Sequence, residues 1–131
     1  MSSLVEANAA RRLGEMEAAN PGAHFFGRHG AGTTIEAQHI RATTGLTPDG
    51  FAGRAVDSSR FFSNQLQLNA AQRAQTIFQQ TGKSSFSFDM GTMVGEGFTR
   101  GGGELIRTAN VQAVFRNGQL YTMFPKLGPI P

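Results

Sequence analysis

The residue types best suited to proton transfer lie in residues 28–32, where Arg28 and His29 precede a glycine-rich turn. Histidine can act as an acid or a base near neutral pH because its unperturbed pKa is about 6.5. An arginine beside it can bind an anion, and glycines allow the backbone to approach a ligand closely. This combination is typical of a site that works on a phosphate group.

The other histidines and Arg41 are further candidates for such a site. His24 is interpreted either as a second proton carrier or as a partly buried loop residue. His39 is expected on a packed or solvated face of a helix. Arg41 is predicted near the C-terminus of the same helix, where it would contact a phosphate or remain solvated.

Two charged residues further along the chain each allow two interpretations of their role. Arg60 is expected either to pair with Asp57 or to contact RNA. Glu96, which stands between two glycines, is either an exposed base or part of a bulge at the edge of a strand.

Several other kinds of site are excluded or disfavoured. The chain has no cysteine, so disulfides, thiolate nucleophiles and cysteine-based metal centres are excluded. The histidines lack a His-x-x-x-His spacing and no carboxylate pair lies near them, which disfavours a metal centre. No Gly-x-Ser-x-Gly motif is present. We therefore expect chemistry that needs no metal or other cofactor, such as RNA cleavage through the substrate's own 2′-hydroxyl.

The overall charge favours an anionic partner. The chain of 131 residues has a net charge of +3, with ten arginines against two lysines. Arginine binds phosphate bidentately and stacks on bases, although a genome rich in G and C also raises arginine content. No apolar run approaches the ~20 residues of a membrane span, and the N-terminus lacks the apolar stretch of a signal peptide. We expect no membrane anchor, and export only as part of a larger protein or by another route.

Hydrophobic periodicity predicts three helices, over residues 2–20, 35–43 and 70–80. Thr33 or Thr34 would cap the second helix and Gly45 would end it, while Asn69 would cap the third and Gly82 would end it. Residues 24–32 are predicted to be irregular, and 47–50 to form a turn. Residues 51–64 are predicted to be mostly loop, with a short helical turn around 59–62.

Alternating patterns then predict four strands, over residues 84–90, 93–99, 105–116 and 119–125. The fold class is therefore α+β, with N-terminal helices followed by an antiparallel sheet of about four strands. Residues 1–22 are predicted to form a loosely packed helix or linker, and residues 23–131 the functional domain.

The Asn-Gly pair at 117–118 predicts a two-residue hairpin turn. With that register Ala113 would pair with Thr122 and Val111 with Phe124. Arg107, Thr122 and Phe124 would then share one face of the sheet, as the floor of a nucleotide-binding cleft. Thr122 would otherwise pack its methyl group in the core.

Five segments of the chain resemble the C-terminal toxin domains of bacterial polymorphic and contact-dependent inhibition systems. They cover roughly residues 24–126 and read RHG at 28–30, RATTGLTPDG at 41–50, DSSRF at 57–61, VGEGF at 94–98 and YTMFP at 121–125. The order of helices before sheet and the closing Thr-x-aromatic-Pro are similar to the barnase–EndoU–colicin–RelE class of ribonucleases.

The resemblance implies roles for individual residues. His29 would be the general acid or base, Thr122 a phosphate ligand and Phe124 a base-stacking ring in place of a tyrosine. The catalytic lysine of EndoU-like enzymes has no counterpart, so Arg41 or Arg107 would substitute. The predicted substrate-binding residues are Arg28, Arg60, Arg107 and Phe124, beside the predicted catalytic residues His29, Arg41 and Thr122.

Together these observations predict a metal-independent endoribonuclease toxin that cleaves tRNA or other cytoplasmic RNA, with no role for DNA. The phenylalanine pairs at 25–26 and 61–62 would supply rings for unpaired bases or contribute to the core. The resemblance further implies delivery into the cytoplasm of a target cell and an acidic immunity protein as partner.

Two other functions remain open. One is an NAD-dependent ADP-ribosyltransferase that uses Arg41, the Ser84–Ser85 region and Glu96. The other is a non-catalytic module that binds RNA or protein.

Overall fold

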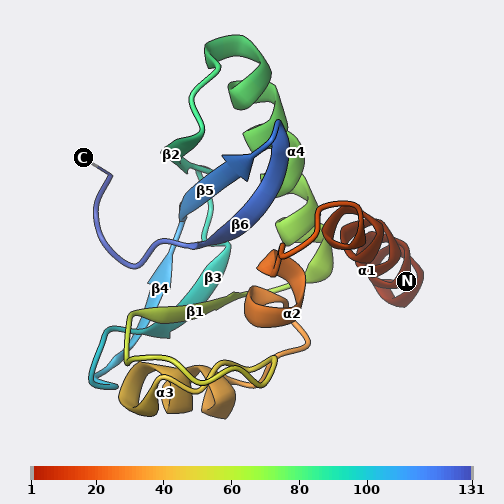
Figure 1. Ribbon diagram of the computed structural model, residues 1–131. Coiled ribbons are helices and arrows are strands. Elements are labelled where there is room, and N and C mark those ends of the chain that lie inside the picture. Colours follow the sequence, from red (N-terminus) through yellow and green to blue (C-terminus); the bar gives the residue numbers. More distant parts are fainter. Residues whose placement is uncertain (1, 131) are drawn as a thin grey trace.

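The computed structural model describes residues 2–130 (Figure 1). Met1, the first residue of the predicted segment 1–22, and Pro131, the last residue of the predicted domain 23–131, lie outside this range. Within it, the elements follow in the order α1 (Ser2–Ala18), α2 (Phe25–His29), α3 (Ile35–Thr44), β1 (Ser58–Phe61), α4 (Asn64–Thr81), β2 (Ser85–Asp89), β3 (Gly95–Phe98), β4 (Leu105–Thr108), β5 (Asn110–Arg116) and β6 (Gln119–Pro125). None of the helices in this range combines the length and apolar character needed to cross a membrane.

The strands of residues 2–130 form two antiparallel sheets of three strands, in the orders β1-β3-β4 and β2-β5-β6. The α+β class is confirmed, with six strands rather than about four. The single strand predicted over residues 105–116 is wrong, because the chain passes from one sheet to the other at Ala109. There the Thr108 hydroxyl accepts a hydrogen bond from the Asn110 N–H at 3.0 Å and donates to the Lys126 carbonyl at 2.7 Å. Such local side-chain bonds compete with a continuous ladder.

The signals that end helices are confirmed, but one predicted start is wrong. Gly45 and Gly82 end α3 and α4 with φ values of 87° and 70°, and the Thr34 hydroxyl caps α3 by accepting from the Ala37 N–H. Helix α4 begins at Asn64 rather than after Asn69, because Ser63 is the capping residue.

Two loop predictions are wrong because tertiary partners stabilise regular structure there. Residues 25–29 form α2, whose first N–H groups at Phe26 and Gly27 donate to the Glu17 carboxylate at 2.8 and 3.1 Å. The expected helical turn around 59–62 is instead the strand β1, which pairs with β3. The turn predicted at 47–50 is confirmed by the Gly50 N–H, which donates to the Thr47 carbonyl.

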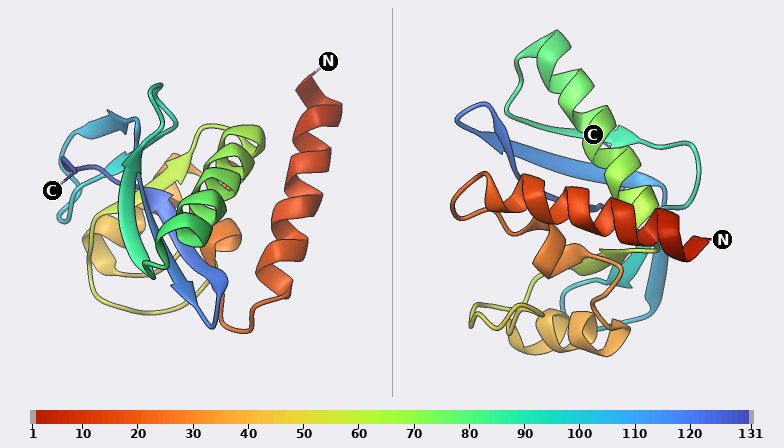
Figure 2. Two further views of the ribbon diagram at one scale, coloured as in Figure 1. Left: turned by 90° about the horizontal axis from the view of Figure 1, so that it is seen from above. Right: turned by 90° about the vertical axis from the view of Figure 1, so that its right-hand side faces the viewer.

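The first helix belongs to the same hydrophobic core as the rest of the described chain. Ala9 and Leu13 are fully buried, and α1 packs against α4 (Figure 2). The Glu6 carboxylate accepts hydrogen bonds from the N–H groups of Asn64 and Gln65 at the start of α4. The expectation that this helix packs loosely is therefore wrong for its inward face.

Replacement of Leu13, which is 0% exposed, by alanine should lower the free energy of unfolding by about 3 kcal/mol. Leu4 lies on the same helix and is 68% exposed, so Leu4→Ala should change stability by less than about 0.5 kcal/mol. Urea denaturation of both variants measures the difference. Equal stability of the two variants would mean that α1 is a detachable linker.

Candidate functional site

A pocket of about 400 Å³ lies between α2, α3, the loop before β1, and β6. The helices supply two of its side chains, the loops before α2 and after α3 supply three, and β6 supplies two. Its lining residues are His24, His29, Arg41, Val56, Asp57, Thr122 and Phe124. Four of the predicted site residues, which are far apart in the sequence, thus meet at one pocket.

A β-bulge in the terminal hairpin aims Thr122 and Phe124 into this pocket. The turn at Asn117 and Gly118 is confirmed by their φ values of 54° and 78°. The first two pairs also agree with the predicted register, Arg116 with Gln119 and Phe115 with Leu120.

Beyond these two pairs the predicted register is wrong. A shift after Phe115 pairs Val114 with Thr122 and Gln112 with Phe124. A shift of one residue exchanges the two faces of a strand. The core therefore receives Met123 instead of Thr122, and Thr122 is free to line the pocket.

His29 ends α2 and is held by β1. Its Nδ1 donates to the Ser59 carbonyl at 2.8 Å, since a carbonyl only accepts, and this bond leaves Nε2 as the basic nitrogen of the neutral ring. The side chain is only 3% exposed, and its ring centroid lies 5.3 Å from that of Phe124. Burial lowers the pKa of His29 to about 3, so the imidazole is neutral at physiological pH.

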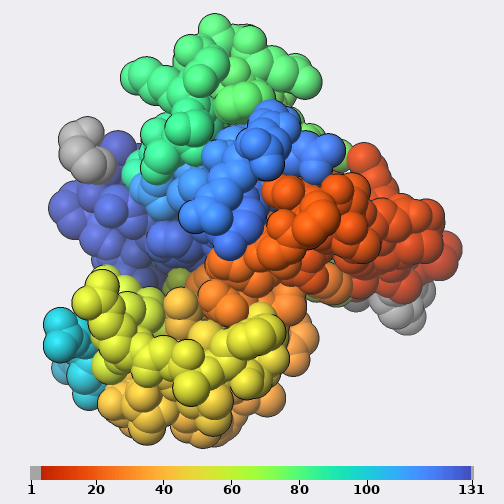
Figure 3. All heavy atoms as spheres, viewed as in Figure 1, coloured from red at the N-terminus to blue at the C-terminus, as the bar shows by residue number. Residues whose placement is uncertain are grey.

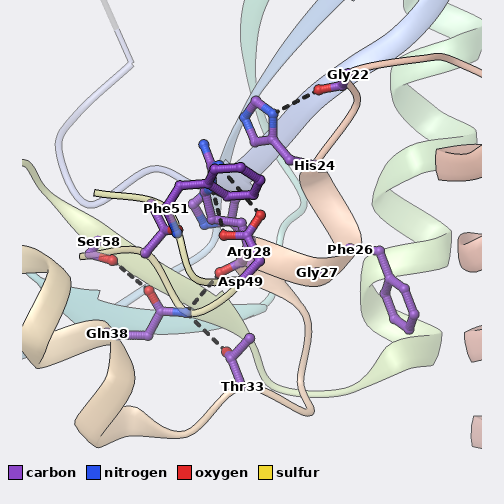
Figure 4. A network of polar contacts seen from close by, with 12 residues as sticks. Gly22, His24, Phe26, Gly27, Arg28, Thr33, Gln38, Asp49, Phe51 and Ser58 are labelled. Atoms are coloured by element: carbon purple, nitrogen blue, oxygen red, sulfur yellow. Dashed lines mark hydrogen bonds and ion pairs between the residues drawn. The ribbon is translucent and has the colours of Figure 1, made fainter. Parts of the chain in front are cut away.

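His24 lies directly before α2 and is held by β6. Its backbone N–H donates to the carbonyl of Tyr121, and its ring packs edge-on against the Tyr121 ring at 5.3 Å. Nδ1 donates to the Gly22 carbonyl at 3.2 Å (Figure 4), which again leaves Nε2 as the basic nitrogen. Partial burial is the main cause that lowers the pKa of His24, and the charge of Arg28 adds to it.

Arg41 is a half-buried cation in the same pocket. Within residues 2–130, no carboxylate lies within ion-pair distance of its guanidinium and no hydrogen bond holds it. Its pKa is lowered first by burial and then by the charge of Arg28. A half-buried cation without a counter-ion is unfavourable, and an anion bound in the pocket would relieve that penalty.

Gln38, one turn before Arg41, fixes the position of α3. Its amide nitrogen donates to the Arg28 carbonyl at 3.0 Å and to the Thr33 hydroxyl at 2.9 Å, while Ser58 donates to its amide oxygen (Figure 4). This fully buried side chain ties α3 to α2 and β1, and so sets the distance between Arg41 and the histidines.

The other predicted substrate-binding arginines lie outside the pocket lining. Arg28 is paired with Asp49 through two hydrogen bonds of 3.0 and 3.3 Å. Arg60 is paired with Glu96 at 2.8 Å and not with Asp57. Arg107 is exposed on β4, opposite Glu96, so its predicted place on one sheet face with Thr122 and Phe124 is wrong.

Two pocket residues, Val56 and Asp57, come from the loop before β1 and were not predicted to be site residues. The Asp57 carboxylate accepts a hydrogen bond from the Arg100 N–H at 2.8 Å. Of the phenylalanines proposed to stack on bases, Phe25 and Phe61 are fully buried in the core, and only Phe62 is exposed. Within residues 2–130, no three His, Asp or Glu side chains converge as ligands for a metal ion.

The buried His29 should make the fold sensitive to acid. Unfolding restores its ordinary pKa of 6.5, so between pH 6.5 and about 3 the unfolded chain binds a proton that the folded chain does not. Stability should therefore fall as the pH drops through this window, by roughly 3 kcal/mol between pH 7 and pH 4 from His29 alone. Urea denaturation at pH 7 and pH 4 measures this. His29→Asn should lose less stability over that interval than the parent protein, and an equal loss would contradict the burial of a neutral imidazole.

Comparisons of this chain with protein-family models, with curated proteins and with solved structures give no match, so its function has to be argued from the geometry of this pocket.

Proposed function

We propose that this protein is a metal-independent endoribonuclease that cleaves RNA in the pocket between α2, α3 and β6. The observation that carries the proposal is a half-buried Arg41 with no ionic partner among residues 2–130. It shares one pocket with two imidazoles whose Nδ1 atoms are both held by backbone carbonyls. Such a pocket offers two oriented Nε2 atoms and one cation. This is the set that transesterification of a phosphodiester requires.

The proposed reaction uses His29 as the base. The RNA 2′-hydroxyl attacks the adjacent phosphorus while its proton passes to His29 Nε2, which is basic because Nδ1–H is bonded to Ser59. The phosphate charge in the pocket raises the pKa of both imidazoles above their values in the free protein. His24 then carries a proton on Nε2 and donates it to the 5′-oxygen as the P–O5′ bond breaks. The products are a 2′,3′-cyclic phosphate and a free 5′-hydroxyl.

Two residues are proposed to stabilise the phosphorane. Arg41 provides a half-buried cation, and a charge that is partly removed from water interacts more strongly than one in bulk solvent. Thr122 lines the same pocket, and in this proposal its hydroxyl donates to a non-bridging oxygen. Phe124 packs beside the His29 ring, and in this proposal it helps to keep that imidazole desolvated.

The biological setting is proposed from the sequence resemblance. We propose a toxin domain that is delivered to a target cell, where it cleaves cytoplasmic RNA, with tRNA as the first candidate. Its inhibitor would be an acidic protein whose carboxylates occupy the phosphate position beside Arg41.

The test is incubation of the purified protein with total bacterial RNA in EDTA, with the new ends analysed chemically. Cleavage in the presence of chelator that leaves 2′,3′-cyclic phosphate ends supports the proposal. A requirement for added divalent metal, or tight RNA binding with no cleavage, would contradict it, and the second outcome would favour a non-catalytic RNA-binding module.

The ADP-ribosyltransferase alternative gains no support from the geometry. Glu96, its proposed catalytic acid, is paired with Arg60, and neither Glu96 nor Ser85 lines the pocket that contains Arg41. Hydrolysis of NAD by the purified protein would nevertheless support the ADP-ribosyltransferase alternative.

A further inference from the structure

The loop between α3 and β1, which forms part of the pocket wall, presents a phenylalanine to solvent. The Phe51 ring is 62% exposed, although a ring of this size is ordinarily buried. In Figure 3 this loop, in yellow, lies on the face turned toward the viewer, below the residues of α2 in orange and the terminal hairpin in blue. The same loop supplies Val56 and Asp57 to the pocket wall.

Hydrogen bonds to Thr47 hold the backbone of Phe51, and the Arg28 guanidinium lies over its ring. The Phe51 N–H donates to the Thr47 hydroxyl at 2.8 Å, and its carbonyl accepts from the Thr47 N–H at 2.8 Å. The Arg28 guanidinium lies 5.8 Å from the ring centroid, and Asp49 fixes that guanidinium through two hydrogen bonds (Figure 4). The Arg28 cation thus stabilises the position of the Phe51 ring by a cation–π contact, while much of the ring surface is exposed to solvent.

The contacts of Arg28 connect this ring to the pocket. Arg28 directly precedes His29 in α2, and its charge contributes to the lowered pKa values of His24, His29 and Arg41. The charge of Asp49 acts on His24 and Arg41 in the opposite direction. The Arg28–Asp49 pair that supports Phe51 is therefore within electrostatic range of the proposed catalytic groups.

We infer that Phe51, supported by Arg28, is a stacking subsite for an unpaired nucleobase next to the nucleotide that is cleaved. The inference deepens the proposed ribonuclease function and rests on it. A ring on a hydrogen-bonded backbone with a cation over one face loses less conformational entropy on binding than a side chain in a flexible loop, and an aromatic face stacks on any base. Bases in a duplex are already stacked on their neighbours, so the subsite selects single-stranded RNA.

The test compares Phe51→Leu with Phe51→Trp on a single-stranded RNA oligonucleotide that the parent protein cleaves. Leucine keeps an apolar contact with Arg28 but cannot stack, so kcat/KM should fall by about five- to hundredfold, whereas tryptophan should retain it. Met93→Leu is the control, because Met93 is an exposed apolar side chain that has no proposed role in RNA binding, and its kcat/KM should stay unchanged.

Oligonucleotides that carry a single abasic site identify the stacked base. The effect of Phe51→Leu should disappear when the abasic site is at one particular position beside the cleavage site. If Phe51→Leu cleaves every substrate as well as the parent protein does, the inferred stacking subsite is contradicted, whereas the proposed ribonuclease function is still supported.

A binding measurement separates the two proposals further. A DNA oligonucleotide lacks the 2′-hydroxyl and cannot be cleaved, so a fluorescent 2-aminopurine base within it reports stacking alone. Quenching by the parent protein that is lost in Phe51→Leu but kept in Met93→Leu supports the subsite even if no RNA is cleaved. Equal quenching by both variants overturns it.

Discussion

Replacement of His29 by asparagine is expected to lower kcat for RNA cleavage by about 10²–10⁴-fold while the fold is retained. The asparagine amide nitrogen occupies the place of His29 Nδ1 and can still donate to the Ser59 carbonyl, which now accepts at 2.8 Å. The variant therefore keeps the structural bond and removes only Nε2, the proposed base. Cleavage of a defined oligonucleotide, with stability followed by urea denaturation, measures both effects.

His39→Asn is the matched control for this prediction. His39 lies on α3 with its Nε2 bonded to the Gly102 carbonyl, and it is exposed and outside the pocket. Its replacement should leave kcat unchanged. Cleavage by His29→Asn within about threefold of the parent rate would remove His29 from the mechanism.

Replacement of Arg41 by methionine is expected to lower kcat by about 10²–10³-fold without any loss of stability. The guanidinium is half-buried with no counter-ion among residues 2–130, so the folded protein without substrate gains little from it. Methionine fills a similar volume and carries no charge to desolvate. The free energy of unfolding should stay the same or rise, whereas removal of a structural arginine would lower it.

Arg73→Met, on the exposed side of α4, is the control for Arg41→Met and should change neither quantity. A structural role for Arg41 would appear as a fall in stability in parallel with the fall in activity. A normal rate in Arg41→Met would leave the pocket without its proposed phosphate ligand.

The two paired arginines illustrate why a count of cations does not locate a site. In the sequence Arg28 and Arg60 are as plausible as Arg41, but each is bonded to a carboxylate, Asp49 or Glu96, from another part of the chain. Which arginine remains unpaired depends on which carboxylates the fold brings within ion-pair distance. That is decided by contacts between residues far apart in the sequence.

The fold itself is predictable where local chemistry is decisive. The glycines at 45, 82 and 118 adopt positive φ values at the positions that the helix ends and the hairpin turn require. The helix 35–44 and the strand 85–89 are indicated by periodicity and capping. Segments that depend on a distant partner, such as α2 on Glu17 and β1 on β3, are not predicted, because isolated short elements have no local reason to form.

By itself, the sequence determined the α+β class, the terminal hairpin and the presence of histidines, arginines and a strand threonine suited to phosphate chemistry. Only the tertiary structure decided that the hairpin changes register after Phe115, so that Met123 enters the core and Thr122 lines the pocket. Turn chemistry fixes a register only near the turn. Further along, tertiary packing decides the register: the bulge turns Met123 and Pro125 toward the core and leaves Thr122 and Phe124 in the pocket with His29 and Arg41.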